Sequence, residues 1–327
     1  MAGGQTFSVA SSIGNFATQK LTKEVRALGQ PMMRWRQFTR VEPAFSARQS
    51  DTLLFPKRLN VQADPSTGAI VPERAPIPST GYSTLQGQVI CQKTAIKIPY
   101  TLEATTYSEI DLDQQNKEAL ADFLAKALNY RTFRAFEDSN VVYTATGDTT
   151  TPAATWSTNG TPGAASTRDI ELFDLKNIVD ALKAGNYGGA ASAPVAPYDG
   201  ANYQQICSVS AARAYRDDPE FEEAARFGDP ARIFAGEVGR IYGVRTVEDN
   251  HILGDTPAGH KGEAMIFGKD PVIEIVALRE EVRMEQPAEL GTDMAIGAVY
   301  LGGFSIVWAY NAVTEPDNRI VRLTSVA

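Results

Sequence analysis

Residues 111–138 read DLDQQNKEALADFLAKALNYRTFRAFED and carry the longest helical pattern of the chain. Asp111 and Asp113 stand at its start, where carboxylates accept backbone N–H groups and oppose the helix dipole. The pattern predicts a helix from about 112 to 138, which at ~1.5 Å per residue is a rod of roughly 40 Å. Apolar residues recur there with the three- and four-residue spacing of one helix face, namely Leu120, Phe123, Leu124, Ala127, Leu128, Phe133 and Phe136.

Two segments before this helix are rich in branched and aromatic residues, as strands are. They are residues 52–60 (TLLFPKRLN) and residues 88–99 (QVICQKTAIKIP). We expect a long hairpin whose connection projects outward, because so long a connection without helical signal is uncommon inside a compact domain. A floppy surface loop is the alternative, which the prolines of the connection disfavour because they restrict the chain. These prolines are Pro65, Pro72, Pro76 and Pro78.

The first 60 residues are basic, although the chain as a whole is acidic. They carry nine Lys or Arg and three Asp or Glu, whereas the net charge of the chain is -8. This asymmetry predicts a basic arm that meets nucleic acid or the acidic body of a neighbouring copy. Leu21, Val25 and Leu28 predict one short helix in the arm, before a break at residues 29–31. The alternative is a basic helix that is merely solvated.

Large apolar and basic side chains alternate immediately after that break. The apolar ones are Met32, Met33, Trp35 and Phe38, and the basic ones are Arg34, Arg36 and Arg40. Aromatic and arginine side chains are enriched at protein interfaces, which favours an extended segment pressed against a partner. Packing into the core of the same chain is the alternative.

The second half of the chain mixes helical and strand-like segments. Residues 144–167 are dominated by Thr, Ala, Gly and Pro, so we expect a loop or domain boundary there. Residues 166–169 (STRD) are expected to cap a helix that ends near Gly185 and buries one apolar face, formed by Leu172, Leu175, Ile178, Val179 and Leu182. A short helix is expected near Ser210. Strands are expected at 204–209, 241–248, 264–267, 272–278, 294–310 and 319–324, and this order indicates an α+β fold.

Composition and missing motifs weaken most enzymatic interpretations. With 327 residues, 43% hydrophobic and 21% charged, the chain holds about two domains' worth of core. No run of ~18 apolar residues predicts a membrane span. The chain has two histidines, His251 and His260, and lacks the glycine-rich phosphate motifs and the G-x-S-x-G elbow. We therefore expect a protein that is not an enzyme and takes no cofactor.

Three groups of reactive side chains have a structural explanation that we favour. Cys91 and Cys207 have no C-x-x-C partner and are expected to be buried structural thiols. The alternating acids Glu109, Asp111 and Asp113 fit helix capping better than a Mg²⁺ or Ca²⁺ site, because a calcium loop's glycine and distal glutamate are missing. The acidic cluster at 217–223 is expected to be a solvated face, and a carboxylate-based hydrolase is its remote alternative.

The order of these parts resembles the major capsid protein of tailed double-stranded DNA bacteriophages. The most specific stretch is FGDPARIFAGEVGRIYGVRTVEDNHIL, Phe227–Leu253, because it is similar to the place in these coat proteins where a loop gives way to a strand ending in an acid and Asn250. The resemblance implies an α+β fold, the tailed-phage major capsid fold, in five parts. These are an N-terminal arm (1–50), an extended β-hairpin loop (51–100), a peripheral domain with a long spine helix (101–165), an axial domain (166–263) and C-terminal strands completing the peripheral domain (264–327).

The resemblance also implies a structural function. Such a protein self-assembles through hexamers and pentamers into an icosahedral shell, which encloses the phage double-stranded DNA genome. It would be located in the virion after assembly in the host bacterial cytoplasm. The implied partners are further copies, a separate scaffolding protein, a portal, decoration proteins and packaged DNA held by weak non-specific contacts, with no membrane. An encapsulin-like compartment shell is the alternative within this fold class.

Under this resemblance, the candidate assembly residues lie in the arm and the hairpin. Removal of residues 1–40 is expected to leave folded subunits that fail to close a shell. The candidate interface residues are Arg34, Trp35, Arg36, Arg40, Lys57, Arg58, Glu73 and Arg74.

Overall fold

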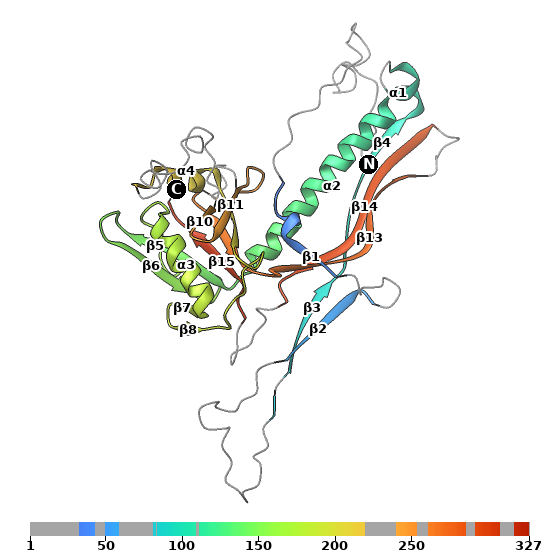
Figure 1. Cartoon of the computed structure of the whole chain (residues 1–327). Helices are drawn as coiled ribbons and strands as arrows, with labels where there is room; N and C mark the ends of the chain where they lie inside the picture. Colours follow the sequence, from blue (N-terminus) through green and yellow to red (C-terminus); the bar gives the residue numbers. More distant parts are fainter. Residues whose placement is uncertain are drawn as a thin grey trace, which may run out of the picture.

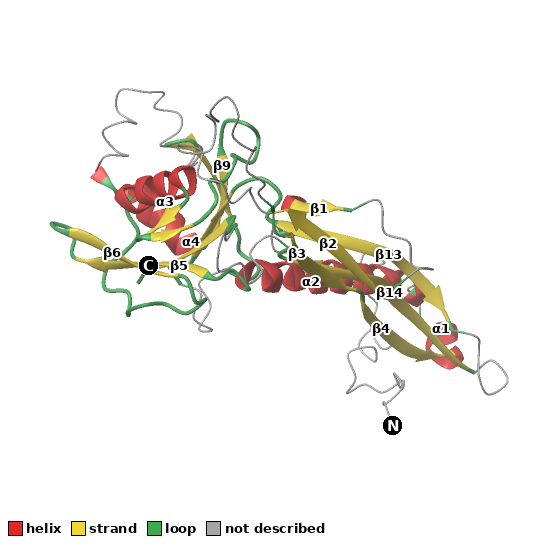
Figure 2. Ribbon diagram, turned by 90° about the horizontal axis from the view of Figure 1, so that it is seen from below, coloured by secondary structure: helices red, strands yellow, loops and turns green. Residues whose placement is uncertain are grey.

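The computed structural model describes residues 33–42, 50–58, 81–82, 84–108, 111–219, 240–253, 261–285, 292–307 and 317–326. Within them the chain forms a four-stranded sheet, a seven-stranded sheet and two two-stranded pairs. The long helix α2 runs along the four-stranded sheet. The seven-stranded sheet and its helices lie at the C-terminal end of α2 (Figure 1). The hairpin β2–β3 projects away from both, so the described chain is elongated rather than round (Figures 1 and 2).

Helix α2 spans Leu112–Glu137, which confirms the predicted long helix. Asp111 caps it, because its side chain accepts the backbone N–H groups of Asp113 and Gln114. The predicted apolar face is partly wrong, since Phe123 is 43% exposed. Burial follows every fourth residue instead, which turns the buried stripe slowly around the helix and leaves Phe123 on its flank. The buried stripe consists of Leu112, Asn116, Leu120, Leu124, Leu128, Thr132 and Phe136.

The four-stranded sheet has the order β1-β13-β14-β4. Its strands are β1 (Thr39–Val41), β4 (Gln92–Thr101), β13 (Val272–Met284) and β14 (Asp293–Ser305), and helix α1 (Leu102–Tyr107) follows β4. β13 therefore continues beyond the predicted end at Leu278. Tyr100, Ile296 and Tyr300 pack on the leucine stripe of α2, so one face of this sheet is buried by the helix.

The seven-stranded sheet has the order β10-β11-β9-β12-β15-β5-β6. Its strands are β5 (Val141–Gly147), β6 (Pro152–Ser157), β9 (Tyr203–Cys207), β10 (Arg240–Ile241), β11 (Val244–Glu248), β12 (Ala264–Phe267) and β15 (Ile320–Thr324). Residues 264–327 were expected to complete the peripheral domain, and their described strands are divided between the two sheets. β12 lies between β9 and β15 in this sheet, and β15 pairs in parallel with β5. β13 and β14 join the sheet beside α2.

The predicted loop at 144–167 is also corrected, since it contains most of the β5–β6 hairpin. Its turn is built by Gly147, whose φ is 84°, and by Asp148, which accepts the backbone N–H groups of Thr150 and Thr151. In the ladder, Thr144 pairs with Thr155 and Ala145 pairs with Ala154. Small residues of this kind carry little strand signal, although threonine suits a pleated surface well.

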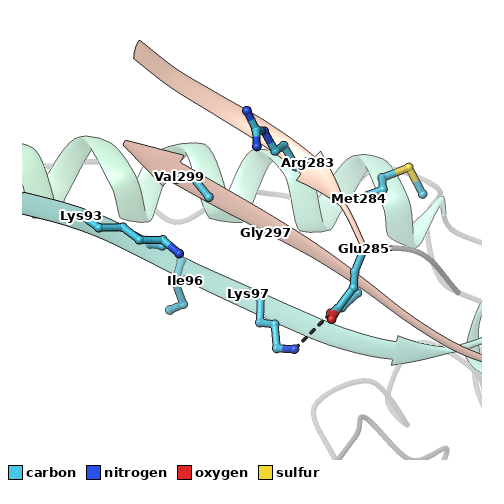
Figure 3. Close-up of a pocket in the computed structure, with 10 residues that line it drawn as sticks. Lys93, Ile96, Lys97, Arg283, Met284, Glu285, Gly297 and Val299 are labelled. Carbon is cyan, nitrogen blue, oxygen red and sulfur yellow. Dashed lines mark hydrogen bonds and ion pairs between the residues drawn. The ribbon is translucent and has the colours of Figure 1, made fainter. Parts of the chain in front are cut away.

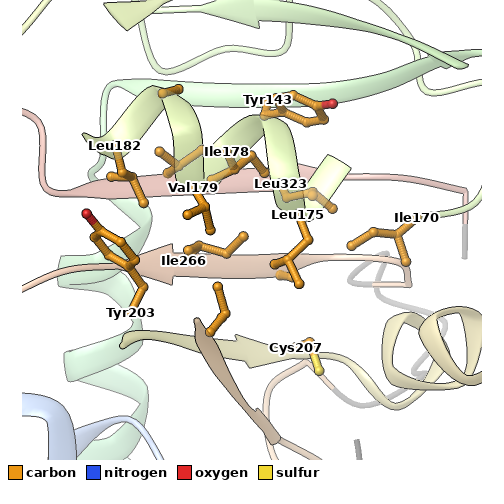
Figure 4. Close-up of a cluster of buried hydrophobic side chains, with 14 of the residues drawn as sticks. Tyr143, Ile170, Leu175, Ile178, Val179, Leu182, Tyr203, Cys207, Ile266 and Leu323 are labelled. Atoms are coloured by element: carbon orange, nitrogen blue, oxygen red, sulfur yellow. The ribbon is translucent and has the colours of Figure 1, made fainter. Parts of the chain in front are cut away.

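Helices α3 (Leu172–Ala184) and α4 (Val209–Asp217) belong to the seven-stranded unit. α3 buries the predicted apolar face on Ile266 and Leu323 of the sheet (Figure 4). It ends at Gly185 as predicted, in the left-handed conformation with a φ of 66°. The predicted cap at residues 166–169 is wrong, because Glu171 and Asp174 form a capping box. The short strands β7 (Asn186–Tyr187) and β8 (Ala190–Ala191) follow.

The projecting hairpin consists of β2 (Thr52–Arg58) and β3 (Thr84–Ile90), which pair antiparallel from Thr52↔Ile90 to Arg58↔Thr84. Its second strand differs from the predicted one at 88–99. The chain turns at Cys91 and enters the four-stranded sheet as β4, so the predicted run is divided between two sheets. The predicted connection at 61–87 lies mostly outside the described residues, as do the predicted helix near Leu21–Leu28 and His260.

Candidate assembly surfaces

The arm root, which we define as residues 33–42, packs against the body of its own chain. A turn of 3-10 helix, η2 (Arg36–Phe38), leads into β1, which pairs in parallel with the start of β13. The segment after residue 39 is extended, as expected, but it extends along a sheet of the same subunit.

Trp35 is a core residue, which decides between the two interpretations of its position. Its side chain is 0% exposed, and its ring meets Phe133 and Phe136 edge-on at centroid distances of 5.1 and 5.3 Å. Its indole Nε1–H donates to Asp249 Oδ2 at 3.1 Å. A buried indole with a satisfied N–H is well suited to fixing the start of the arm.

Arg36 is held by a buried carboxylate of the four-stranded sheet. Its Nη2 and Nε atoms donate to Glu274 Oε1 at 2.8 and 3.2 Å, and Tyr300 Oη donates to the same oxygen at 2.9 Å. Glu274 is 1% exposed. Burial lowers the pKa of Arg36, but its hydrogen bonds to Glu274 and Glu280 outweigh this effect and leave that pKa raised. The guanidinium is therefore charged at all accessible pH values.

Of the other two arginines of the arm root, only Arg40 is exposed. Arg34 is half-buried, and Arg40 pairs with Asp270 at 3.0 Å while remaining 51% exposed. Exposed pairs of this kind contribute little to stability, so Arg40 is available to another molecule at small cost.

The described hairpin contacts the rest of the chain at points along its length. Towards its outer end, Lys57 Nζ lies 3.4 Å from Asp317 Oδ2, and the Arg58 guanidinium covers the Tyr82 ring at 5.8 Å. In its middle, Gly87 lies so close to Val307 that an added Cβ would be 2.9 Å from its carbonyl oxygen. Large apolar surface is exposed on both sides of these contacts, at Leu54 (50%), Ile90 (48%) and Tyr82 (60%). Glu73 and Arg74 lie outside the described residues.

Comparisons with known proteins identify this architecture. No protein-family model matches the chain, and no curated protein is similar to it in sequence. Among solved structures, the head of Helicobacter pylori bacteriophage KHP40 matches with a TM-score of 0.72 and 11% identity over 99% of both chains. The acidic stable capsid of Helicobacter pylori bacteriophage KHP30 matches with a TM-score of 0.70 and 11% identity over 97% of both chains. The capsid of cyanophage Pam1 matches with a TM-score of 0.68 and 15% identity, over 99% of this chain and 98% of that one.

The chain has the major capsid fold of tailed bacteriophages. The fold class expected from the order of arm, hairpin and long helix is therefore confirmed. The match covers nearly the whole chain, so both sheets and the hairpin belong to this capsid fold.

The sheet face that α2 leaves open in this capsid fold contains a shallow groove of about 320 Å³. Its floor is made of small residues, Ala95, Ala295 and Gly297. Figure 3 shows Lys97 and Glu285 joined across one end, where their charged atoms are 3.0 Å apart. Lys93 and Arg283 lie along the other walls. The groove has a polar rim and an apolar floor, which suits contact between surfaces, and it contains no nucleophile paired with a base.

The reactive groups singled out in the sequence have structural surroundings in this capsid fold. Burial raises the pKa of both Cys207, which is fully buried, and Cys91, so both are protonated thiols at neutral pH. Asp218 accepts the backbone N–H of Leu172 at 3.0 Å, whereas Asp217 is exposed. The other acids of that cluster lie outside the described residues.

Among the residues that the structure describes, no three His, Cys, Asp or Glu side chains come together as a metal site requires. No described helix has the length and apolar character needed to cross a bilayer.

The candidate residues are distributed over two surfaces rather than one patch. Arg34, Arg36 and Arg40 belong to the arm root, and Lys57 and Arg58 to the outer end of the described hairpin. Sequence reasoning missed their partners, Glu274, Asp270 and Asp317. These acids lie more than 200 positions from the basic residues that they bind, and no local pattern marks them.

Proposed function

We propose that the protein is a structural major capsid protein, whose copies assemble into a closed icosahedral shell. The observation that carries this proposal is the full-length agreement of its fold with capsid and head structures of several phages. A fold alone does not define a function. Here, however, the chain also carries the two features that assembly needs, an anchored arm root and a hairpin that projects from the body.

The shell requires one subunit to make several different contacts that close on themselves, through hexamers and pentamers. The hairpin supplies apolar surface at Leu54, Ile90 and Tyr82, which a neighbouring copy would cover. Because the described hairpin already packs on its own chain through Gly87 and Lys57, less ordering entropy is lost when it docks. Residues 1–32 carry three Lys or Arg and one Glu, so their positive charge favours contact with the acidic body of another copy.

The contents and location of the shell follow from the same proposal. The shell would enclose the double-stranded DNA genome of a phage, and the subunit would act in the virion after assembly in the host bacterial cytoplasm. Its net charge of -8 disfavours tight DNA binding, because phosphate binding needs basic groups that release counterions. Packaged DNA then touches the lining only weakly. A separate scaffolding protein, a portal and decoration proteins are the further partners of such a shell.

The proposal is tested by expressing the full chain alone and with a candidate scaffolding protein, followed by sedimentation and negative-stain electron microscopy. Closed particles or six-fold rings are the expected result. Particles that form in infected cells should contain double-stranded DNA. Enclosed enzymes without DNA would instead favour a compartment shell of the encapsulin type. A monodisperse monomer or dimer under both conditions would contradict a shell protein.

A further inference from the structure

Three segments that are distant in sequence meet at one buried polar network. Trp35 of the arm root donates its backbone N–H to Asn129 Oδ1 on α2 at 3.1 Å and its indole N–H to Asp249 Oδ2 at 3.1 Å. The same Asp249 oxygen accepts the backbone N–H groups of Ile252 and Leu253 at 3.0 and 2.9 Å. The network therefore joins the arm root, the long helix and residues 249–253 of the seven-stranded unit.

His251 completes this network through Asn129. Its Nδ1 atom lies 2.8 Å from Asn129 Nδ2. A backbone N–H can only donate, so the contact with Trp35 identifies the oxygen end of the Asn129 amide. The nitrogen end consequently faces His251 and donates to it. His251 Nδ1 must then be an acceptor, which requires the neutral imidazole with its proton on Nε2.

We propose that His251 is a pH-sensitive link, which ties the arm root and α2 to residues 249–253 while its imidazole is neutral and loosens them when it is protonated. Protonation places a second donor on Nδ1, opposite the donating amide nitrogen of Asn129. Two donors cannot form a hydrogen bond. Asn129 cannot turn its oxygen towards His251 without giving up the backbone N–H of Trp35. Acidification therefore breaks either the contact between Asn129 and His251 or the contact between Asn129 and Trp35.

The surroundings of His251 set the sign of this effect. Burial lowers the pKa of His251, Asp249 in its own segment raises it, and Lys126 on α2 lowers it, so the result is a lowered pKa. The native state therefore takes up the proton at a lower pH than the unfolded chain does. The contribution of the link to stability is complete above the ordinary histidine pKa of about 6.5, and it is lost as the pH falls from there through the lowered pKa.

Asp249 has a second carboxylate oxygen, Oδ1, which the neutral network does not use. Asp249 Oδ1 is buried and has no hydrogen-bond partner among the described residues. It belongs to the same segment as His251 and carries negative charge. When the imidazolium leaves Asn129, this oxygen is an unused acceptor within the segment that carries the imidazolium.

Hydrogen exchange of the full chain at pH 5.0 and pH 7.5 tests the proposal, with His251→Asn as the matched variant. The asparagine oxygen replaces Nδ1 as an acceptor but does not titrate. Comparing the two proteins at the same pH removes the intrinsic pH dependence of exchange. We expect equal protection of the Trp35, Ile252 and Leu253 amides at pH 7.5. At pH 5.0 the native protein should exchange faster than His251→Asn, by up to about tenfold for each unit by which the pKa of His251 is lowered and by no more than about thirtyfold in total, because pH 5.0 is about 1.5 units below the ordinary pKa.

His251→Ala, which has no acceptor at any pH, should exchange faster than the native protein already at pH 7.5. Equal native and His251→Asn protection at both pH values would overturn the proposal, as would full protection in His251→Ala at pH 7.5. A measurement on the unchanged His251 keeps the proposal testable if the variants at position 251 do not fold. With His260→Gln, the chain keeps one histidine, and its NMR titration should give a pKa below 6.5. A pKa at or above that value would equally overturn the proposal.

Discussion

Arg36 of the arm root and Glu274 of β13 form a charged pair in which Nη2 and Oε1 are 2.8 Å apart. The carboxylate is buried, whereas the guanidinium is partly exposed. The pair fixes the point at which the arm leaves the body, because β1 begins three residues later and pairs with the strand that carries Glu274.

Arg36→Ala should destabilise the subunit by about 2–4 kcal/mol, because it leaves the Glu274 carboxylate buried without its cation. Arg40→Ala is the matched control, since Arg40 makes an exposed pair with Asp270 and should cost less than about 0.5 kcal/mol. Urea unfolding of both variants measures the difference. Equal effects of the two substitutions would show that the arm root is not anchored through Glu274.

Truncation should separate the arm from its root. Because Trp35 and Arg36 are packed into the body, we expect removal of residues 1–40 to unfold the subunit, unlike the expectation from the sequence, which was a folded subunit. Removal of residues 1–32 keeps this arm root, so it should cost less free energy of unfolding than the longer truncation while it impairs shell closure. Unfolding curves and electron microscopy of both truncations check this. Normal shells from the shorter truncation would exclude a role of residues 1–32 in shell closure.

The hairpin should tolerate no side chain at Gly87, which lies in the middle of the β2–β3 ladder. An added Cβ would lie 2.7 Å from Val307 Cγ1, so Gly87→Ala should cost about 1–3 kcal/mol or displace the hairpin. Gly81→Ala is the control, because nothing lies within 4 Å of the Cβ it would add. Its effect should stay within about 0.5 kcal/mol. Thermal unfolding distinguishes the two, and a neutral Gly87→Ala would mean that the hairpin does not pack on Val307.

The seven-stranded unit depends on a buried carboxylate at the start of α3. Asp174 is 0% exposed and accepts hydrogen bonds from Arg168, from Tyr143 at 2.6 Å and from the backbone of Glu171 at 2.9 Å. Asp174→Ala should therefore cost about 3–5 kcal/mol. Asp180→Ala, on the exposed side of the same helix, should be nearly neutral. Calorimetry of Asp174→Ala and Asp180→Ala measures the difference. Melting temperatures equal to that of the native protein in both variants would contradict this role of Asp174.

The β5–β6 turn should have a measurable acid titration. Hydrogen bonds from the Thr150 side chain and from the backbone and side chain of Thr151 lower the pKa of Asp148 to about 2. Its stabilising effect is present above the ordinary aspartate pKa of about 3.9 and is lost as the pH falls towards 2. Thr150→Val should move this pKa upward in an NMR titration, and an unchanged pKa would exclude Thr150 as the main cause.

The elements that depend on residues close together in the sequence were predicted correctly. The capped helix after Asp111 and the end of α3 at Gly185 follow from residues within a few positions, and both were predicted. Sheet membership does not follow in this way, because β12 and β13 are separated by a short link and yet belong to different sheets. The β5–β6 hairpin pairs with β15 and buries Val141 and Tyr143 in the core, and the Thr- and Ala-rich residues between them and the end of β6 do not reveal either contact.

The candidate interface was predicted less well for the same reason. Arg36 and Trp35 have the composition of interface anchors, but their partners Glu274 and Asp249 lie more than 200 positions away. Only the folded chain shows that these partners are internal. The exposed apolar surface of the hairpin, in contrast, follows from a strand pair that projects beyond the body.

A cryo-electron microscopy reconstruction of the particles formed by the full chain would show whether its copies build a shell through the hairpin. We expect closed shells built from five- and six-fold rings, in which the described subunit fits and a neighbouring copy covers Leu54, Ile90 and Tyr82 of each hairpin. A small closed oligomer without such a lattice, or a shell in which the hairpin remains uncovered, would contradict this expectation.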